Sequence, residues 1–410
     1  MNTFLVRGLM IFSLLTATFF AGCGSSNSTE AKIAIPVFFP FTGDFASAAS
    51  GLELPFELAV ETINQAGGIR GQLVVAKFID TESDPDVARA RAEEEMANGD
   101  VSALFGGLLY SVEENLFEVA VDHEALLIVN MNDFGSPRYF SSPEAAENND
   151  LFLRTIPDFS GEVQLLVDRW NKRGEESIVH IVRPLEGWLI LDQVLQKTCE
   201  SRGCTIKRVL VQESAPVVEV LVRKVLAMKP DAIKLSFDQD TGLEILRELY
   251  LQGWKKDVNA AITIARLRAD HLLDDGLSEK IYTALSLSNS TYINDLHRRG
   301  TAAYADRWLT AVYAAGGYDA FILLSLALQT ADARDARAIA STMRTMSAEP
   351  GTEIGPFDYP LALELIAEGK PIHYRGAIGL RGFDSFGEAD SEVVPTLVKF
   401  IDGQPVPYLD

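Results

Sequence analysis

The spacing of apolar side chains changes between residues 33 and 85, and this change limits the fold more than any other feature of the chain. From Ile33 to Phe39 they alternate at every second position, which predicts a strand. From Leu52 to Ile63 they recur at helical spacing instead. Pro55 suits the first turn of that helix and Gly67-Gly68 suit its end, and a further strand follows that ends in acidic residues. The segment therefore predicts a strand, a helix and a second strand in succession.

A unit of this kind is expected to place its first loop, residues 42–51, at the carboxyl end of a parallel sheet. Open α/β folds bind their ligands at that edge, in the crevice beyond the ends of the strands. The loop is rich in small residues. Binding, rather than catalysis, is therefore the first hypothesis for function.

Strands and helices continue to alternate beyond the opening unit. The expected strands are 101–105, 126–129, 177–182, 205–211, 231–237 and 260–264; the expected helices are 85–96, 111–123, 161–173, 187–202, 215–228 and 241–252, with a crossing segment at 151–156. Two successive doubly wound α/β sets predict two domains that face each other across a cleft. The length of 410 residues agrees, because one hydrophobic core seldom serves so long a chain.

Short motifs along the chain match one protein family in their order and spacing. In the opening unit they are Pro40, Thr42, Gly43, Ala59-Val60-Glu61, Ile63-Asn64, Ala66-Gly67-Gly68-Ile69, Gly71, Asp80-Thr81 and Ser83-Asp84-Pro85. Farther along they are 152–157, 229–233, 318–320 and the tail from 382 to 398. These segments resemble the periplasmic solute-binding proteins of the branched-chain amino acid (leucine/isoleucine/valine-binding) type, the extracytoplasmic receptors of ABC importers.

The resemblance implies a type I periplasmic-binding fold, in which two doubly wound, Rossmann-like α/β lobes are joined by a three-strand hinge. Lobe 1 would comprise residues 31–155 plus 289–378, and lobe 2 residues 156–288 plus 379–410. A small-molecule ligand that touches both lobes would stabilise the closed form by hinge bending, and an importer permease would be the protein partner. The resemblance implies no cofactor.

The amino terminus resembles the signal sequence of a bacterial lipoprotein. Arg7 precedes an apolar run, residues 9–20, that is too short to span a membrane and ends at Ala21-Gly22-Cys23. The resemblance implies that residues 1–22 are a signal peptide, that Cys23 carries lipid, and that residues 23–30 are a flexible tether. The alternative is an ordinary signal peptide with an incidental cysteine. On the first interpretation the protein lies in the periplasm or on the outer face of a bacterial membrane, held by its lipid anchor only.

The other two cysteines, Cys199 and Cys204, are separated by four residues at the end of an expected helix. An even number of cysteines at this spacing suggests a disulfide in an oxidising compartment, and two inert thiols are the alternative. The formal net charge is −22 without a cluster of Lys and Arg, which argues against nucleic acid as a partner.

Ligand contacts are expected from the loops that follow the strands, at 42–50, 106–111, 130–133, 183–188 and 237–240. The candidates are Phe45, Ser47, Ser50, Gly107, Leu109, Tyr110, Ser111, Asn130, Asn132, Asp133, Trp188, Phe237, Asp238 and Arg266. By the resemblance, amides around Gly107 would bind an amino-acid carboxylate. Ser111 would either help to bind an anion at the start of its helix or merely cap that helix.

Two positions depart from the amino-acid-binding members of the family. Asp133 stands where a threonine would help to hold a carboxylate, and a like charge there would disfavour that group. The segment 263–266, where the family places an acid for the ammonium group, ends in Arg266 and contains no carboxylate. Asp238 is either a substitute for that acid or a solvated loop residue. Amides, polyols, cations and aromatic compounds therefore stay open as ligands.

An enzyme is the main alternative from another class of function. The five histidines are scattered, and none has a metal-ligand spacing. The chain has neither a phosphate-binding Walker loop nor a Gly-x-Ser-x-Gly motif. We therefore expect no catalytic residues and no metal. A membrane-anchored ligand sensor with the same fold is a further alternative, which the sequence does not separate from an import receptor.

Overall fold

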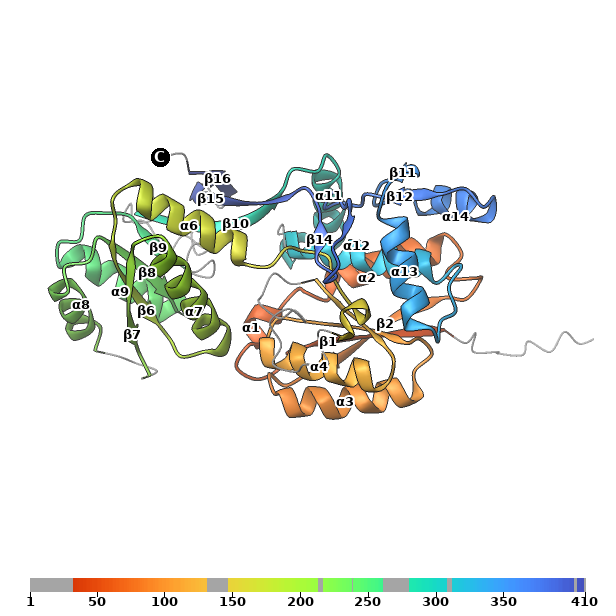
Figure 1. Cartoon of the computed structure of the whole chain (residues 1–410), viewed down its shortest axis with the longest axis horizontal. Coiled ribbons are helices and arrows are strands. Elements are labelled where there is room, and N and C mark those ends of the chain that lie inside the picture. The colour runs from red at the N-terminus through yellow and green to blue at the C-terminus, as the bar shows by residue number, and fades with distance from the viewer. Residues whose placement is uncertain are drawn as a thin grey trace, which may run out of the picture. The chain divides into compact units, whose positions relative to one another are not determined.

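The computed structural model describes residues 32–130, 147–212, 217–237, 239–260, 280–307, 312–401 and 404–408, and Figure 1 traces their course. Within this part of the chain the strands form two large sheets and two small ones. Both large sheets are built mainly from parallel strands with helices on their faces, so the expected α/β class is confirmed.

The first sheet has the strand order β2-β1-β3-β4-β5, and all of its neighbouring strands are parallel. Its strands are β1 (Ile33–Phe39), β2 (Val74–Asp80), β3 (Ala103–Gly106), β4 (Leu126–Val129) and β5 (Phe152–Arg154). The alternating residues from Ile33 thus form the strand that their spacing predicts, and β4 has the predicted bounds.

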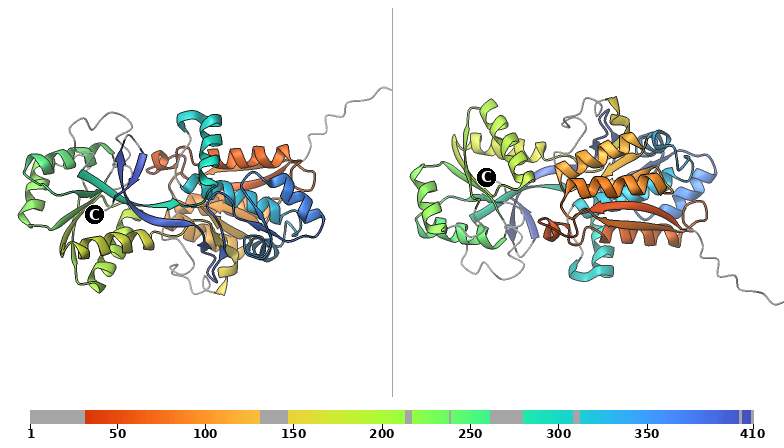
Figure 2. Two further views of the ribbon diagram at one scale, coloured as in Figure 1. Left: turned by 90° about the horizontal axis from the view of Figure 1, so that it is seen from above. Right: turned by 90° about the horizontal axis from the view of Figure 1, so that it is seen from below.

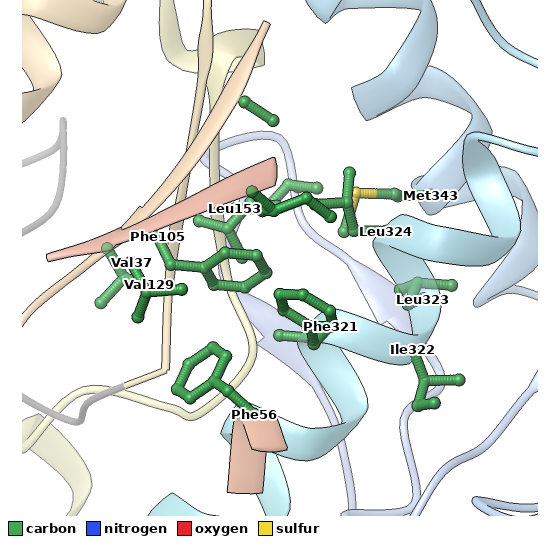
Figure 3. Close-up of a cluster of buried hydrophobic side chains, with 14 of the residues drawn as sticks. Val37, Phe56, Phe105, Val129, Leu153, Phe321, Ile322, Leu323, Leu324 and Met343 are labelled. Carbon is green, nitrogen blue, oxygen red and sulfur yellow. The ribbon is translucent and has the colours of Figure 1, made fainter. Parts of the chain in front are cut away.

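Helices cover both faces of the first sheet. On one face lie α2 (Leu54–Gln65), α12 (Val312–Ala327) and α13 (Ala336–Met346), and on the other α3 (Pro85–Asn98) and α4 (Tyr110–Asp122), as Figure 1 shows. Nearly every residue of α12 is buried, because this helix is apolar all round. Phe321 from α12 packs against Phe56 of α2 and Phe105 of β3, with ring centroids 5.8 and 5.5 Å apart (Figure 3). This aromatic group is the centre of the first core.

The second sheet has the order β16-β15-β10-β9-β8-β6-β7. Its parallel strands are β6 (Ser177–Val182), β7 (Thr205–Leu210), β8 (Ala232–Ser236), β9 (Val258–Ala260) and β10 (Ile281–Ser288), and β15 (Val393–Ile401) and β16 (Gln404–Pro407) add to it antiparallel. One face carries α6 (Ser160–Lys172) and α7 (Glu186–Ser201), the other α8 (Val218–Ala227) and α9 (Gln239–Leu251), and Figure 2 shows this arrangement from two sides.

Shorter elements complete the described chain. They are α1 (Ala46–Ala49), the 3-10 turns η1 (Asn149–Leu151) and η4 (Ala305–Arg307), α11 (Ile293–Tyr304), α14 (Tyr359–Ala367), the pair β11 (Thr352–Ile354) and β12 (Ile372–Tyr374), and the pair β13 (Gly382–Phe383) and β14 (Ala389–Asp390). The first of these, α1, lies inside the predicted loop 42–51, where the sequence gives no helical spacing.

Of three helix and strand boundaries, one agrees with its prediction and two differ. Asp84 caps α3 as expected, since its carboxylate accepts from the amides of Asp86 and Val87. Ser111, by contrast, is not a cap, because α4 begins one residue earlier at Tyr110 and Leu109 occupies the capping position. The strand predicted at 260–264 lies at Val258–Ala260, and residues 261–264 are outside the described part.

The chain passes three times between the two large sheets. It leaves the first sheet after β5, returns from β10 to the helices α11 to α14, and crosses again to β15. Adjacent crossings are joined by backbone hydrogen bonds: Arg154 N donates to Gly387 O at 2.7 Å, and Asn289 N donates to Glu392 O at 3.0 Å. Three strands of chain therefore run side by side where the sheets connect.

The structure joins Cys199, in the last turn of α7, to Cys204, just before β7, by a disulfide with a Cα–Cα distance of 4.9 Å. Cys23 lies outside the described residues. Among the helices that the structure describes, none combines the length and the apolar character needed to cross a bilayer.

Candidate ligand site at the two switch points

Each large sheet has one point where neighbouring strands lead the chain away in opposite directions. In the first sheet this switch point lies between β1 and β3, and in the second between β6 and β8. Loops that leave a sheet at such a point diverge and leave a crevice at the carboxyl ends of the strands, where open α/β folds bind ligands. The loops concerned begin after Phe39, Gly106, Val182 and Ser236. They coincide with four of the five loops that the sequence nominates.

The loop after β1 is held rigidly against the end of β2. Thr42 donates to Asp80 through its hydroxyl at 2.7 Å and its amide at 3.1 Å. Ser83 accepts from the amide of Phe45 at 3.1 Å and donates to the carbonyl of Thr42 at 2.9 Å. Burial tends to raise the pKa of Asp80, but the hydrogen bonds from Thr42 and from neighbouring amides prevail and lower it. The carboxylate therefore stays charged and keeps the loop in place.

The first-loop candidates differ in their surroundings. Phe45 is half-buried, stands just before α1 and packs against the first core. Ser47 lies within α1, and Ser50 follows that helix and is exposed. Gly43 has a φ of +84°, and a Cβ there would lie 2.3 Å from the carbonyl oxygen of Glu82. The close approach of the two loops thus requires glycine at that position.

The loop after β3 makes a tight turn into α4. Gly107 is buried, and Leu108 has a φ of +88°, a backbone conformation that costs free energy for a residue with a branched side chain. Leu109 is 3% exposed and belongs to the first core, and its contact with a ligand stays a prediction. Tyr110 opens the helix and is half-buried against that core.

A carboxylate already lies at the start of α4. Glu186 Oε1 accepts from the amide of Ser111 at 3.2 Å, and Glu186 Oε2 accepts from the hydroxyl of Ser111 at 2.8 Å. Glu186 is the first residue of α7, the helix that follows β6. This contact joins the loops at the two switch points. Glu186 falls in the nominated segment 183–188, but sequence reasoning did not single it out; the available signal was an acidic residue at the expected start of a helix.

Residues 32–359 match the model of the periplasmic binding protein family. The chain belongs to the periplasmic binding proteins.

Relatives of this periplasmic binding protein include receptors with different cargoes. The substrate-binding protein BasB of a chemotactic signal transduction system in Halobacterium salinarum is 24% identical over 82% of this chain and 79% of its own. The leucine-binding protein LivK of Thermotoga maritima has a similar fold, with a TM-score of 0.69 and 15% identity over 92% of this chain and 98% of its own. A solute-binding protein of Rhodopseudomonas palustris, solved with benzoate, has a TM-score of 0.67 and 14% identity over 92% and 95%.

Asn130, directly after β4, is almost fully buried in this periplasmic binding protein. Its amide nitrogen donates to the carbonyl of Tyr313 at 3.5 Å, and a Cβ on Gly317 would lie 2.9 Å from the same nitrogen. Its Oδ1 accepts no hydrogen bond from the residues that the structure describes. Asn130 thus joins the sheet to α12. Asn132, Asp133, Asp238 and Arg266 lie outside the described residues, so the arguments built on them stay predictions.

The two aromatic candidates of the second sheet have different positions. Trp188 is half-buried in the first turn of α7, two residues beyond Glu186. Phe237 is 1% exposed and packs in the core with Ile233 and Leu235. The nomination of Phe237 as a ligand contact is therefore not supported by its position, because the strand period carries its side chain into the core.

A Ser, a His and an Asp meet in the second sheet, but they are buried. The Nδ1 of His180 lies 2.6 Å from Asp192 Oδ1, and its Nε2 lies 2.9 Å from Ser236 Oγ. All three side chains have no exposed surface, so no substrate reaches the hydroxyl. Burial lowers the pKa of His180 to about 4, so the ring is neutral at physiological pH. We assign this group a structural role.

The same face of the second sheet carries a buried lysine beside His180. Lys234 pairs with His180 across the sheet and donates to Asn259 Oδ1 at 2.8 Å. Burial lowers the pKa of Lys234 to about 8, against the opposing effect of Glu162 and Asp192. Within the described residues, no group of three or more His, Cys, Asp or Glu side chains is arranged to hold a metal ion.

Proposed function

We propose that the protein is an extracytoplasmic receptor that captures a small solute between two lobes for an ABC importer. The observation that carries the proposal is a contact between the two switch points: Ser111, at the start of α4 after β3, bonds Glu186, at the start of α7 after β6, in a member of the periplasmic binding proteins. A solute bound between these loops would add contacts to both lobes and favour closure.

The lobes are proposed to follow the three crossings. Lobe 1 comprises residues 31–155 plus 289–378, and lobe 2 residues 156–288 plus 379–410. The separate hydrophobic cores of the two large sheets support a division into two lobes, since each sheet is packed against its own helices. Leu380, Phe383 and Ala389 of the proposed lobe 2 pack with the first core. The backbone bonds between crossings at Arg154 and Gly387 and at Asn289 and Glu392 would then lie in the hinge.

The cargo is proposed to be a small polar organic solute: an amino acid or a related amide, polyol, cationic or aromatic compound. The half-buried Phe45 and Trp188 support an apolar side to the site, and Ser50 and Ser111 supply hydroxyls. The relatives support this breadth, because LivK is named for leucine and the Rhodopseudomonas palustris protein was solved with benzoate.

A thermal-shift screen of the mature protein tests the binding function. A true ligand stabilises the folded state by RT ln(1 + [L]/Kd), about 2.7 kcal/mol at a hundred times Kd. Amino acids, amides, polyols, quaternary amines and aromatic acids would be screened, and hits measured by calorimetry. Failure of every class at millimolar concentration, in protein that is folded by circular dichroism, would remove the support for a solute receptor.

The proposed anchor is a lipid on Cys23, with residues 1–22 removed as a signal peptide. The observation that supports it is Ala21-Gly22-Cys23 at the end of an apolar run. Cys23→Ser is expected to move the protein from the membrane fraction to the soluble extracytoplasmic fraction. An unchanged membrane fraction would contradict the anchor.

A ligand sensor is the second candidate, and the likeness to BasB, from a chemotactic signal transduction system, favours it. The two functions differ in what is lost when the gene is deleted. Loss of ligand uptake with normal swimming towards the ligand supports import, whereas loss of directed swimming with normal uptake supports sensing.

A further inference from the structure

We infer that Glu186 occupies the anion position at the start of α4 and thereby selects against ligands that carry a free carboxylate. The inference rests on the proposed binding function and narrows its ligand class. It assigns Glu186 as a residue that determines specificity and assigns the cargo as a neutral or cationic small solute.

The contact supplies a hydrogen-bond acceptor for a backbone amide in the first turn of α4. Ser111 is the second residue of this helix, so its amide has no acceptor within the helix. The capping residue Leu109 offers no side-chain acceptor. Glu186 supplies one, and its second oxygen takes the hydroxyl of the same serine. Both carboxylate oxygens are thus engaged at a helix start, where the helix dipole and the free amides favour negative charge.

Glu186 reaches this position from the other large sheet. It lies 75 residues from Ser111 in the sequence and opens α7, whose own capping residue Leu185 also lacks a side-chain acceptor. The contact therefore links the two switch points without a ligand. In a receptor that closes around its solute, a ligand carboxylate could make the hydrogen bonds that bridge the two switch points. Here Glu186 makes these bonds and so favours the closed form itself.

The consequence for specificity is electrostatic. A ligand carboxylate that sought the donors of Ser111 would have to displace Glu186 or lie beside it, and two like charges at that distance repel. The formal charge of −22 adds a long-range field that repels anions. An amide or a cation meets neither obstacle. Such a ligand leaves Glu186 in place and can donate a hydrogen bond to the Glu186 carboxylate.

Matched pairs of solutes test the inference, with calorimetry on the mature protein. The pairs are leucine with leucinamide and benzoate with benzamide, which differ in the carboxylate. In the wild type, the amide of a pair should bind more tightly than the acid. Glu186→Gln removes the charge and keeps the shape, and it should raise the ratio of acid to amide affinity about tenfold or more. The control Glu219→Gln makes the same change in the first turn of α8, where the side chain is 64% exposed, and should leave the ratio unchanged.

A ligand-free measurement separates this inference from the binding function itself. Spin labels on cysteines at exposed positions 94 and 197, in α3 and α7, report the distance between the two sheets by electron resonance. Glu186→Ala should shift the ligand-free distribution towards longer distances, and Glu219→Ala should not. If no solute binds any variant, the proposed function fails. The change in the spin-label distances then decides by itself whether Glu186 links the two switch points. An unchanged distribution together with an unchanged acid-to-amide ratio would overturn the assignment of Glu186.

Discussion

His180 and Asp192 form a hydrogen bond of 2.6 Å, from Nδ1 to Oδ1, inside the second sheet, where neither side chain has exposed surface. The ionised carboxylate can only accept, so Nδ1 carries the proton and Nε2 is left to accept from the Ser236 hydroxyl at 2.9 Å. This arrangement requires a neutral imidazole. Burial opposes protonation most, and the positive charges of Lys234 and Arg208 oppose it further, so the pKa of His180 is lowered.

The first prediction follows from this pair and concerns acid stability. The unfolded chain protonates His180 near pH 6.5, whereas the folded protein does so only near pH 4. Stability should therefore fall by roughly 3 kcal/mol from this group as the pH drops through that window. His180→Gln should lose this component, measured as urea unfolding free energy at pH 7 and pH 4.5.

Asp319 also makes stability depend on pH, but its effect has the opposite direction. Burial raises its pKa to about 7, against hydrogen bonds from two amides and Tyr374, so its contribution is present below pH 3.8 and lost as the pH rises to 7. It is common to both proteins and cancels in their difference. Parallel pH profiles for the wild type and His180→Gln would contradict the assignment.

The second prediction concerns the aromatic centre of the first core. Phe321→Ala removes a ring that packs on Phe56 and Phe105, and the cavity should cost about 3–5 kcal/mol of unfolding free energy. Leu251→Ala is the control, because that side chain is 80% exposed. Its effect should stay within about 0.5 kcal/mol. Equal effects of the two changes in urea denaturation would show that the group is not the centre of the core.

The third prediction concerns the buried arginine where the chain leaves the first sheet. Arg154 has no exposed surface and lies 3.6 Å from Glu113 and 3.4 Å from Glu388. Arg154→Met should destabilise the protein by about 3–5 kcal/mol, since it leaves buried carboxylates without their cation. Arg223→Met breaks an exposed ion pair with Glu219 and should cost less than about 1 kcal/mol. A cost for Arg154→Met as small as that of the control would contradict the reasoning.

The fourth prediction concerns the disulfide between Cys199 and Cys204. It closes a short loop, so replacing both cysteines by serine should cost only about 2 kcal/mol in the chain-entropy model. Ligand affinity should not change, because the bond lies at the far end of α7 from Glu186. Thermal unfolding with and without a reductant measures the effect. A reductant that left the wild-type melting temperature unchanged would contradict a stabilising disulfide.

The fifth prediction concerns Asp133, which the family resemblance is expected to place where amino-acid-binding members have a threonine. Asp133→Thr should raise the affinity for leucine, because it removes a negative charge from the expected carboxylate site. Calorimetry with leucine and leucinamide measures the effect, and the affinity for leucinamide should change little. Tight leucine binding by the wild type that Asp133→Thr leaves unaltered would refute the argument.

Local patterns predicted the elements well and their long-range contacts poorly. The apolar periods placed β4 and β6 with the observed bounds, and Asp84-Pro85 marked the start of α3. The same period could have assigned Phe237 to the core, since it continues the alternation of Ile233 and Leu235. The start of α4 was misplaced because a leucine at φ +88° gives no signal in the sequence.

The candidate site depended on contacts that no local pattern carries. Glu186 meets Ser111 because two sheets bring together helices that are 75 residues apart. His180, Asp192 and Ser236 meet because β6, α7 and β8 converge in space, although each is unremarkable in its own segment. Sequence reasoning thus nominated the loops of the site and missed the partners across them.

Because α12 is buried in the first core, that core cannot be completed until this late helix has been synthesised. This helix begins at Val312, long after β5 ends at Arg154, and its Phe321 packs on Phe105 of the first sheet and on Phe56 of α2. A growing chain therefore synthesises most of the second sheet while the first still lacks its cover. Until Phe321 is synthesised, a nascent chain exposes an aromatic surface that invites aggregation.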